Sequence, residues 1–141
     1  LGAACLAANQ ALPTLEGRLQ RLRDLLESLL LEEFERDPTF VRINGHLQER
    51  LPNTLSISFR GVVGAQVLAS VSHRVAASAG AACHSSTISV SKVLQAMHVP
   101  LEFAQGTLRL SVGKSTNEGE VREAASLIAG AVKAAKRQSQ S

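Results

Sequence analysis

The chain has 141 residues and a net charge of +3; 45% of its residues are hydrophobic, but the aromatic ones are four phenylalanines. This length suits one domain whose core is built from leucine, valine, isoleucine and alanine. Because the charge is small and dispersed and few rings are available to stack on bases, the composition argues against nucleic acid as a partner.

The cysteine usage favours a reducing compartment, either the cytoplasm or the matrix of an organelle. Cys5 and Cys83 lie far apart and form no CxxC pair, which argues against a disulfide framework and against a metal site. No apolar run reaches the length of a membrane span. We expect Cys5 to pack as a small apolar side chain in an alanine-rich helix over residues 1–10, which Pro13 ends.

Leucines at three- and four-residue steps predict a long helix after Pro13. Its apolar stripe consists of Leu15, Leu19, Leu22, Leu26, Leu29, Leu30 and Phe34. Charged residues, Arg23 among them, fill the opposite side, and packing of the stripe on a sheet is favoured over a coiled coil. Pro38 ends this helix, because the residue before a proline disfavours the helical conformation.

Two strands are predicted next, over residues 40–44 and 55–59. In the second strand Leu55, Ile57 and Phe59 alternate with two serines. One face of this strand is therefore expected to be buried, and the other to be polar or to line a site. A short helix is predicted over residues 65–71.

Small residues dominate the segment 75–83, where Ser78 is the one polar member. Such a backbone can pass close to other groups, and Gly80 can bend sharply. The polar residues 84–87 predict a loop, so Cys83, with His84 beside it, stands where a packed segment opens into a mobile one. Two alternatives remain open from the residues alone: a buried structural thiol, which is the commoner case, and a reactive one.

A helix capped by Ser89 is predicted to follow, with Val93, Leu94 and Met97 in the core, and Pro100 ends it. A helical turn through Phe103 then leads to a third strand.

The third strand, over residues 107–112, alternates as regularly as the second. Leu108, Leu110 and Val112 share its buried face, which places Arg109 on the other face with two hydroxyl residues. An arginine in this setting suits bidentate capture of a carboxylate or a phosphate. A structural ion pair and an exposed sheet face are equally open alternatives.

The last helix begins at a variant capping box, Asn117-x-x-Glu120, and its basic residues near the C-terminal end favour the helix dipole. The elements together predict an α+β domain with a small, largely antiparallel sheet and helices packed on one face. The polar faces of the second and third strands, with the segment around Cys83, would then be free to face a ligand or another domain.

Four stretches carry a resemblance to a known family: residues 51–58 (LPNTLSIS), 79–85 (AGAACHS), 93–97 (VLQAM) and 106–113 (GTLRLSVG). They resemble the C-terminal part of cysteine desulfurases and selenocysteine lyases, which are pyridoxal-phosphate enzymes related to class V aminotransferases. The resemblance covers essentially the whole chain, in order. It implies the small C-terminal domain of a fold-type I pyridoxal-phosphate enzyme that is a homodimer at full length.

The resemblance also implies roles for particular residues. Cys83 would accept sulfur from L-cysteine as a persulfide, or assist the release of selenium from L-selenocysteine, with His84 as a possible auxiliary. Arg109 would hold the substrate's α-carboxylate. A sulfur- or selenium-acceptor protein would be the partner, and iron–sulfur cluster assembly the process served.

The chain also departs from the family pattern, since none of Lys92, Lys114, Lys133 and Lys136 stands in the Ser/His-rich context of the family's cofactor lysine. We therefore expect residues 1–141 to form a single small C-terminal domain, with 1–36 as the helical link from an absent cofactor-binding domain. Alone, the chain would keep a thiol and a carboxylate-binding arginine but form no Schiff base. A desulfurase is favoured as the broader class; the alternatives are a selenocysteine lyase and a cofactor-free sulfur-carrier or interaction module.

Overall fold

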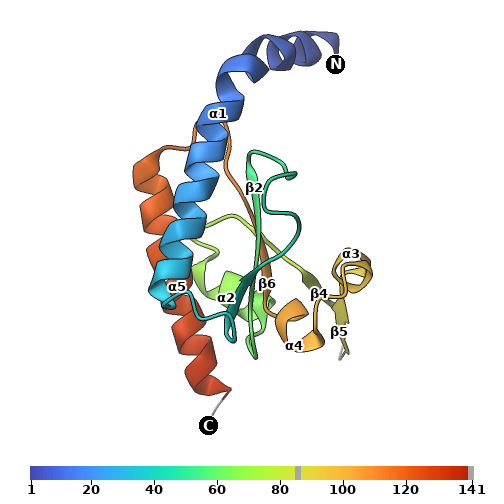
Figure 1. Cartoon of the computed structure of the whole chain (residues 1–141), viewed down its shortest axis with the longest axis vertical. Coiled ribbons are helices and arrows are strands. Elements are labelled where there is room, and N and C mark those ends of the chain that lie inside the picture. Colours follow the sequence, from blue (N-terminus) through green and yellow to red (C-terminus); the bar gives the residue numbers. More distant parts are fainter. Residues whose placement is uncertain (85–86, 140–141) are drawn as a thin grey trace.

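The computed structural model describes residues 1–84 and 87–139, with the backbone alone at 81–84 and 87–89. Its elements are α1 (Gly2–Glu33), β1 (Val41–Ile43), β2 (Thr54–Phe59), α2 (Gly64–Val71), β3 (Ser78–Ala79), β4 (Ala81–His84), β5 (Thr87–Val90), α3 (Lys92–Ala96), α4 (Leu101–Ala104), β6 (Thr107–Ser111) and α5 (Glu118–Gln138). Figure 1 shows α1 and α5 side by side along one side of the sheet, and β4, β5 and α3 grouped on the other side.

Four strands form the main sheet in the order β1-β2-β6-β3, and each neighbouring pair is antiparallel. Strands β4 and β5 pair separately as a two-stranded antiparallel sheet. The predicted α+β class with a small antiparallel sheet is confirmed.

The core lies between the sheet and its helices, where the alternation of β2 and β6 predicted it. Leu55, Ile57 and Phe59 of β2 and Leu108 of β6 are completely buried. The helices supply Leu22, Leu26 and Leu30 from α1 and Val121, Ala125, Ile128 and Val132 from α5. Burial of these side chains is the main force that fixes the two helices on this face of the sheet.

Helix α1 runs without interruption through Pro13, so the expected end of a first helix at Pro13 is wrong. A proline removes one backbone donor, and the Thr14 hydroxyl bonds to the Ala11 carbonyl in the same turn, 3.0 Å away. The first turns of α1 extend past the sheet (Figure 1). Cys5 is exposed there, and the expectation that it packs as an apolar side chain is also wrong.

The helix after β5 begins later than the sequence predicts. Its N-cap is Ser91, whose hydroxyl accepts a bond from the Val93 N–H, and the predicted cap Ser89 belongs to β5. Because α3 is only five residues long, it buries Leu94 alone. Val93 and Met97 are 66% and 39% exposed, where core positions were expected. Leu94 forms a second, smaller apolar cluster with Val99, Phe103 and Ala104.

Helix α5 begins at Asn117 as predicted. Both bonds of the capping box are present, from the Glu120 N–H to the Asn117 side chain and from the Asn117 N–H to the Glu120 carboxylate. Together they satisfy two of the backbone donors that a helix start otherwise leaves unpaired.

Candidate functional site

Arg109 lies at the centre of the polar face of the sheet, opposite the face that packs on the helices. In the register of the sheet its neighbours across the strands are Ser56 of β2 and Ser78 of β3. The side chain is exposed, and its Nη2 donates to the Ser78 hydroxyl over 3.4 Å. Strand alternation therefore predicted the correct face for this arginine.

The charge of Arg109 has no acidic partner within the described part of the chain. The ion pairs found there involve Arg23, Arg36, Arg50, Arg60, Arg74 and Lys133. This argues against the structural ion pair that the sequence left open. An exposed guanidinium whose carboxylate partner is missing remains available for an anionic ligand.

A buried chain of hydrogen bonds links the end of β1 to β2 and to β6, the strand that carries Arg109. Asn44 donates through Nδ2 to the Ser58 hydroxyl over 2.7 Å, and Ser58 is 2.7 Å from the Thr107 hydroxyl. Thr107 in turn donates to the Phe103 carbonyl. Because a carbonyl only accepts, this last bond fixes the direction of all three: Ser58 donates to Thr107 and accepts from Asn44.

Sequence reasoning missed this chain, because Asn44 was interpreted as the last residue of the strand predicted over residues 40–44 and no partner was assigned to its side chain. The signal that could have found it is a polar residue, Ser58, next to the most buried positions of β2. A hydroxyl in that position needs a partner.

Cys83 lies in strand β4, paired with Ile88 of β5, and His84 pairs with Thr87. The expectation of a loop over residues 84–87 is therefore wrong for His84 and Thr87, while Ser85 and Ser86 lie outside the described residues. The β-branched residues of β5 favour a strand, and the polar composition of the segment concealed this signal. We call β4 and β5 together the Cys83 hairpin.

Gly80 attaches the base of the Cys83 hairpin to the strand that carries Arg109. Its N–H donates to the Thr107 carbonyl over 2.8 Å, and its own carbonyl accepts from the Ser91 N–H. A Cβ at this position would lie 2.7 Å from atoms of both Leu94 and Thr107. The expected close approach of the backbone is thus confirmed. Gly80 does not have a positive φ, so the sharp bend that a glycine would allow there does not occur.

Because of this attachment, the backbone of Cys83 cannot lie far from Arg109, the other predicted site residue. Ser78 is the cross-strand neighbour of Arg109, and Cys83 follows it five residues later. Even a fully extended backbone covers no more than about 17 Å over that length. The structure therefore brings the backbone of Cys83 and the arginine to the same region of the fold.

Two recesses flank the Arg109 side chain. The first, of about 300 Å³, is lined by Ala76, Ala77, Ser78 and Ser111 in addition to the arginine. The second, of about 270 Å³, lies between β2, α3 and the β1–β2 loop. Small ligands bind in recesses near this size.

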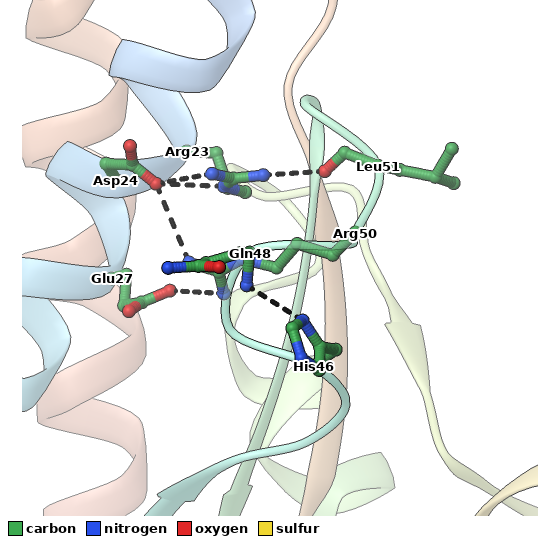
Figure 2. A network of polar contacts seen from close by, with 7 residues as sticks. All are labelled: Arg23, Asp24, Glu27, His46, Gln48, Arg50 and Leu51. Atoms are coloured by element: carbon green, nitrogen blue, oxygen red, sulfur yellow. Dashed lines mark hydrogen bonds and ion pairs between the residues drawn. The ribbon is translucent and has the colours of Figure 1, made fainter.

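The β1–β2 loop, residues 44–53, is fixed to helix α1 by two arginines, as Figure 2 shows. Arg50 bonds to Glu27 over 2.6 Å and lies 3.7 Å from Asp24. Arg23 donates to the Leu51 carbonyl over 2.7 Å and to Asp24. Arg23 is 4% exposed, so its predicted place on the solvent side of α1 is wrong, because the loop covers it.

The lysines of α5 do not face Arg109. Lys133 pairs with Glu33 of α1 over 2.6 Å, and the Lys136 ammonium lies 3.8 Å from the centre of the Phe40 ring. Both contacts are on the side of the sheet that packs on helices. Among residues 1–80 and 90–139, whose side chains the structure describes, no cluster of three or more metal-ligating side chains occurs. No helix in the described part of the chain has both the length and the apolarity to cross a bilayer.

No family model matches the chain, but individual proteins do. It is 35% identical to the cysteine desulfurase of Enterobacter agglomerans over 122 residues, which cover 86% of this chain and 29% of that protein. It is 38% identical to the cysteine desulfurase of Frankia sp. (strain EuIK1) over 131 residues, 93% of this chain and 30% of that protein. The chain therefore spans about 30% of the length of the curated relatives it matches.

Solved structures agree with this. A NifS-like protein superimposes with a TM-score of 0.74 at 27% identity, over 90% of this chain and 30% of that protein. The NifS-like protein from Rickettsia africae ESF-5 superimposes with a TM-score of 0.63 at 21% identity, over 84% of this chain and 29% of that protein. At this identity the likeness supports the fold alone. The fold is that of the C-terminal domain of NifS-like proteins. Together with the sequence relatives, it shows that the chain belongs to the cysteine desulfurase family.

Proposed function

We propose that this chain is the C-terminal domain of a pyridoxal-phosphate-dependent cysteine desulfurase. In this proposal Arg109 binds the carboxylate of the substrate L-cysteine, and Cys83 accepts its sulfur. The observation that carries the proposal is the exposed Arg109, which has no acidic partner in the described part of the chain and lies beside the base of the Cys83 hairpin.

Arg109 suits a carboxylate for two reasons. Its planar guanidinium can donate two parallel hydrogen bonds to the two carboxylate oxygens. Its position is set by a strand held on both sides, and the contact with Ser78 restrains the side chain at the same time. A donor that is already positioned loses little entropy when the substrate binds.

Cys83 would act as a nucleophile through its thiolate. Its sulfur forms a bond to the sulfur of the substrate while the carbon–sulfur bond of the substrate breaks, so that one cysteine and one thiol give alanine and one persulfide. The persulfide then passes its outer sulfur to an acceptor protein. His84, the next residue in β4, is proposed as an auxiliary proton donor or acceptor.

Pyridoxal phosphate would supply the electron sink that makes breakage of this carbon–sulfur bond possible. The residues of this chain do not fit the role of holding it, because Lys133 and Lys136 are engaged on the helical side of the sheet. Lys92 and Lys114 are exposed at the start of α3 and after β6. We propose that the cofactor's lysine belongs to another part of the enzyme, which as a whole is a homodimer.

The test is a chimaera in which this chain replaces the matching 122 residues of the Enterobacter agglomerans cysteine desulfurase. With Arg109→Gln, the KM for L-cysteine should rise about ten- to a hundredfold, because a bidentate contact to a charge is lost. The matched control is Arg42→Gln, an arginine on the same face of the sheet that lines neither recess. An unchanged KM in the Arg109 variant, or an equal rise in both variants, contradicts the proposal.

The same chimaera distinguishes the alternatives. Cys83→Ser should abolish sulfide release from cysteine and leave cofactor absorbance intact. Continued turnover of selenocysteine by that variant, with cysteine turnover lost, would favour a selenocysteine lyase. Sulfur loading of Cys83 in the isolated chain without the cofactor would favour a sulfur carrier.

A further inference from the structure

The recess of about 270 Å³ beside Arg109 is lined by both polar and apolar side chains. Its lining comprises Asn44, Gly45, Arg50, Leu51, Thr54, Ser56, Val93, Leu94, Met97 and Arg109. The polar groups belong to the sheet and the β1–β2 loop, while Val93 and Leu94 of α3 and its C-cap residue Met97 supply apolar ones. Recesses that combine an apolar wall with a few convergent polar groups are typical of small-molecule sites.

The polar part of the lining includes the Arg109 guanidinium, the Ser56 hydroxyl and one buried acceptor without a partner, Asn44 Oδ1. Arg109 brings a guanidinium without an acidic partner in the described part of the chain, and Ser56 is its cross-strand neighbour. The Ser56 oxygen accepts from Asn44 Nδ2 over 3.2 Å, so its own hydroxyl proton remains available to a ligand oxygen. A cation with a hydroxyl donor beside it selects an oxyanion.

Three apolar residues of the lining are exposed. Leu51 and Val93 are each 66% exposed and Met97 is 39% exposed, while Leu94, which also lines the recess, is buried. Side chains of this size stabilise a complex when a ligand covers them, since each buried methylene group is worth about fourfold in affinity.

The wall that faces α3 is held in place before any ligand arrives. The β1–β2 loop is tied to α1 through Arg50 and Glu27 and through the bond from Arg23 to the Leu51 carbonyl (Figure 2). A recess with a fixed wall loses less conformational entropy when a ligand binds than one that must form around the ligand.

We propose that this recess is a subsite for short, unbranched aliphatic carboxylates. The carboxylate lies on Arg109 and Ser56, and the aliphatic tail lies on Leu51, Val93 and Met97. The proposal rests on the proposed function for the role of Arg109 and goes beyond it in assigning the tail. It makes α3, the helix that follows the Cys83 hairpin, a determinant of which carboxylates this family member accepts.

The test uses the 141-residue chain, isotope-labelled, and follows amide shifts by NMR during titration with acetate, butyrate and hexanoate at constant ionic strength. Affinity should rise about fourfold for each added methylene that enters the recess, and butylammonium should cause no saturable shift. Arg109→Gln should abolish binding of all three acids. Arg109→Lys serves as a second variant, and it should weaken all three about equally.

A Val93→Thr, Met97→Gln double variant keeps the size of both side chains and removes their apolar character. It should flatten the dependence on chain length and leave acetate binding unchanged, whereas Leu101→Gln, an exposed apolar residue outside the recess, should change nothing. A flat dependence in the unmodified chain, or a steep one in the double variant, overturns the subsite while leaving the role of Arg109 intact. Acetate binding that survives in Arg109→Gln refutes the proposed function instead.

Discussion

Replacing Gly80 with alanine should loosen the attachment of the Cys83 hairpin to the strand that carries Arg109. The added methyl group would lie 2.7 Å from the Leu94 Cδ1 and the Thr107 Cβ, and 3.0 Å from the Thr107 Cγ2. The Leu94 side chain can rotate away. Thr107 is 2% exposed and held by bonds to Ser58 and the Phe103 carbonyl, so it cannot.

Thr107 therefore sets the magnitude of the effect. Inserting a methyl group into packing that cannot relax costs about 1–3 kcal/mol, and we expect Gly80→Ala to lower the free energy of unfolding by about 2 kcal/mol. The matched control is Gly130→Ala in α5, where a Cβ meets nothing within 4 Å. This variant should raise the free energy of unfolding by about 1 kcal/mol, because alanine is the better helix former.

Urea unfolding followed by far-ultraviolet circular dichroism measures both variants. With a slope of about 2 kcal/mol per molar urea, the two midpoints should move by about 1 M and 0.5 M in opposite directions. A glycine-to-alanine change at an unstrained site stabilises a protein through its unfolded state. If Gly80→Ala is as stable as the unmodified chain, or more so, the close approach of Gly80 to Thr107 does not exist.

The remaining predictions concern the loop network, a turn and the cofactor. Arg50→Met should lower the free energy of unfolding by about 3 kcal/mol, because it leaves the half-buried Glu27 unpaired. The control is Arg36→Met, which removes an exposed ion pair and should lower the free energy of unfolding by less than about 0.5 kcal/mol. Equal effects of the two variants in urea unfolding would contradict this. Hydrogen bonds from the Thr39 hydroxyl and backbone N–H hold the pKa of Asp37 below its ordinary value, so the stability they contribute is present above the unfolded-state pKa and is lost as the pH falls through the folded one. Thr39→Val should therefore raise the pKa of Asp37 in an NMR titration, and an unchanged pKa would refute the assignment. Pyridoxal phosphate followed by borohydride should attach stoichiometrically to no lysine of the chain by peptide mass spectrometry, and one fully labelled lysine would show that the chain holds the cofactor itself.

The two central strands and the face that carries Arg109 could be predicted from the sequence. In both strands the side chains alternate strictly between apolar and polar over five or six residues, and this period has one structural meaning. The start of α5 was predictable for a similar reason, since Asn117 and Glu120 form a local motif whose partners lie within one turn.

Features that depend on distant partners could not be predicted. Arg23 is charged and falls on the polar side of the helical pattern, but a loop almost thirty residues later covers it and supplies the Leu51 carbonyl. The chain of bonds from Asn44 to Thr107 joins the residue after β1 to β2 and β6. Periodicity is a local signal and carries no information about either contact.

The strand that carries Cys83 was missed for a different reason. It is four residues long, and two of the four are alanine, which is depleted in strands. Its identity as a strand comes from pairing with β5 and from the anchor that Gly80 provides on β6. Composition alone therefore predicted no strand here, and placed its last residue, His84, in a loop.

The most direct measurement of the proposed function is the mass of the Cys83 peptide after turnover. The desulfurase chimaera is supplied with L-cysteine in the absence of a reductant, its thiols and persulfides are blocked by alkylation, and its peptides are analysed by mass spectrometry. We predict that one additional sulfur atom is found on Cys83 and none on Cys5, which is exposed and serves as an internal control for unspecific sulfuration. An enzyme that forms alanine while Cys83 stays unmodified, or that carries equal sulfur on both cysteines, would contradict the proposed role of Cys83.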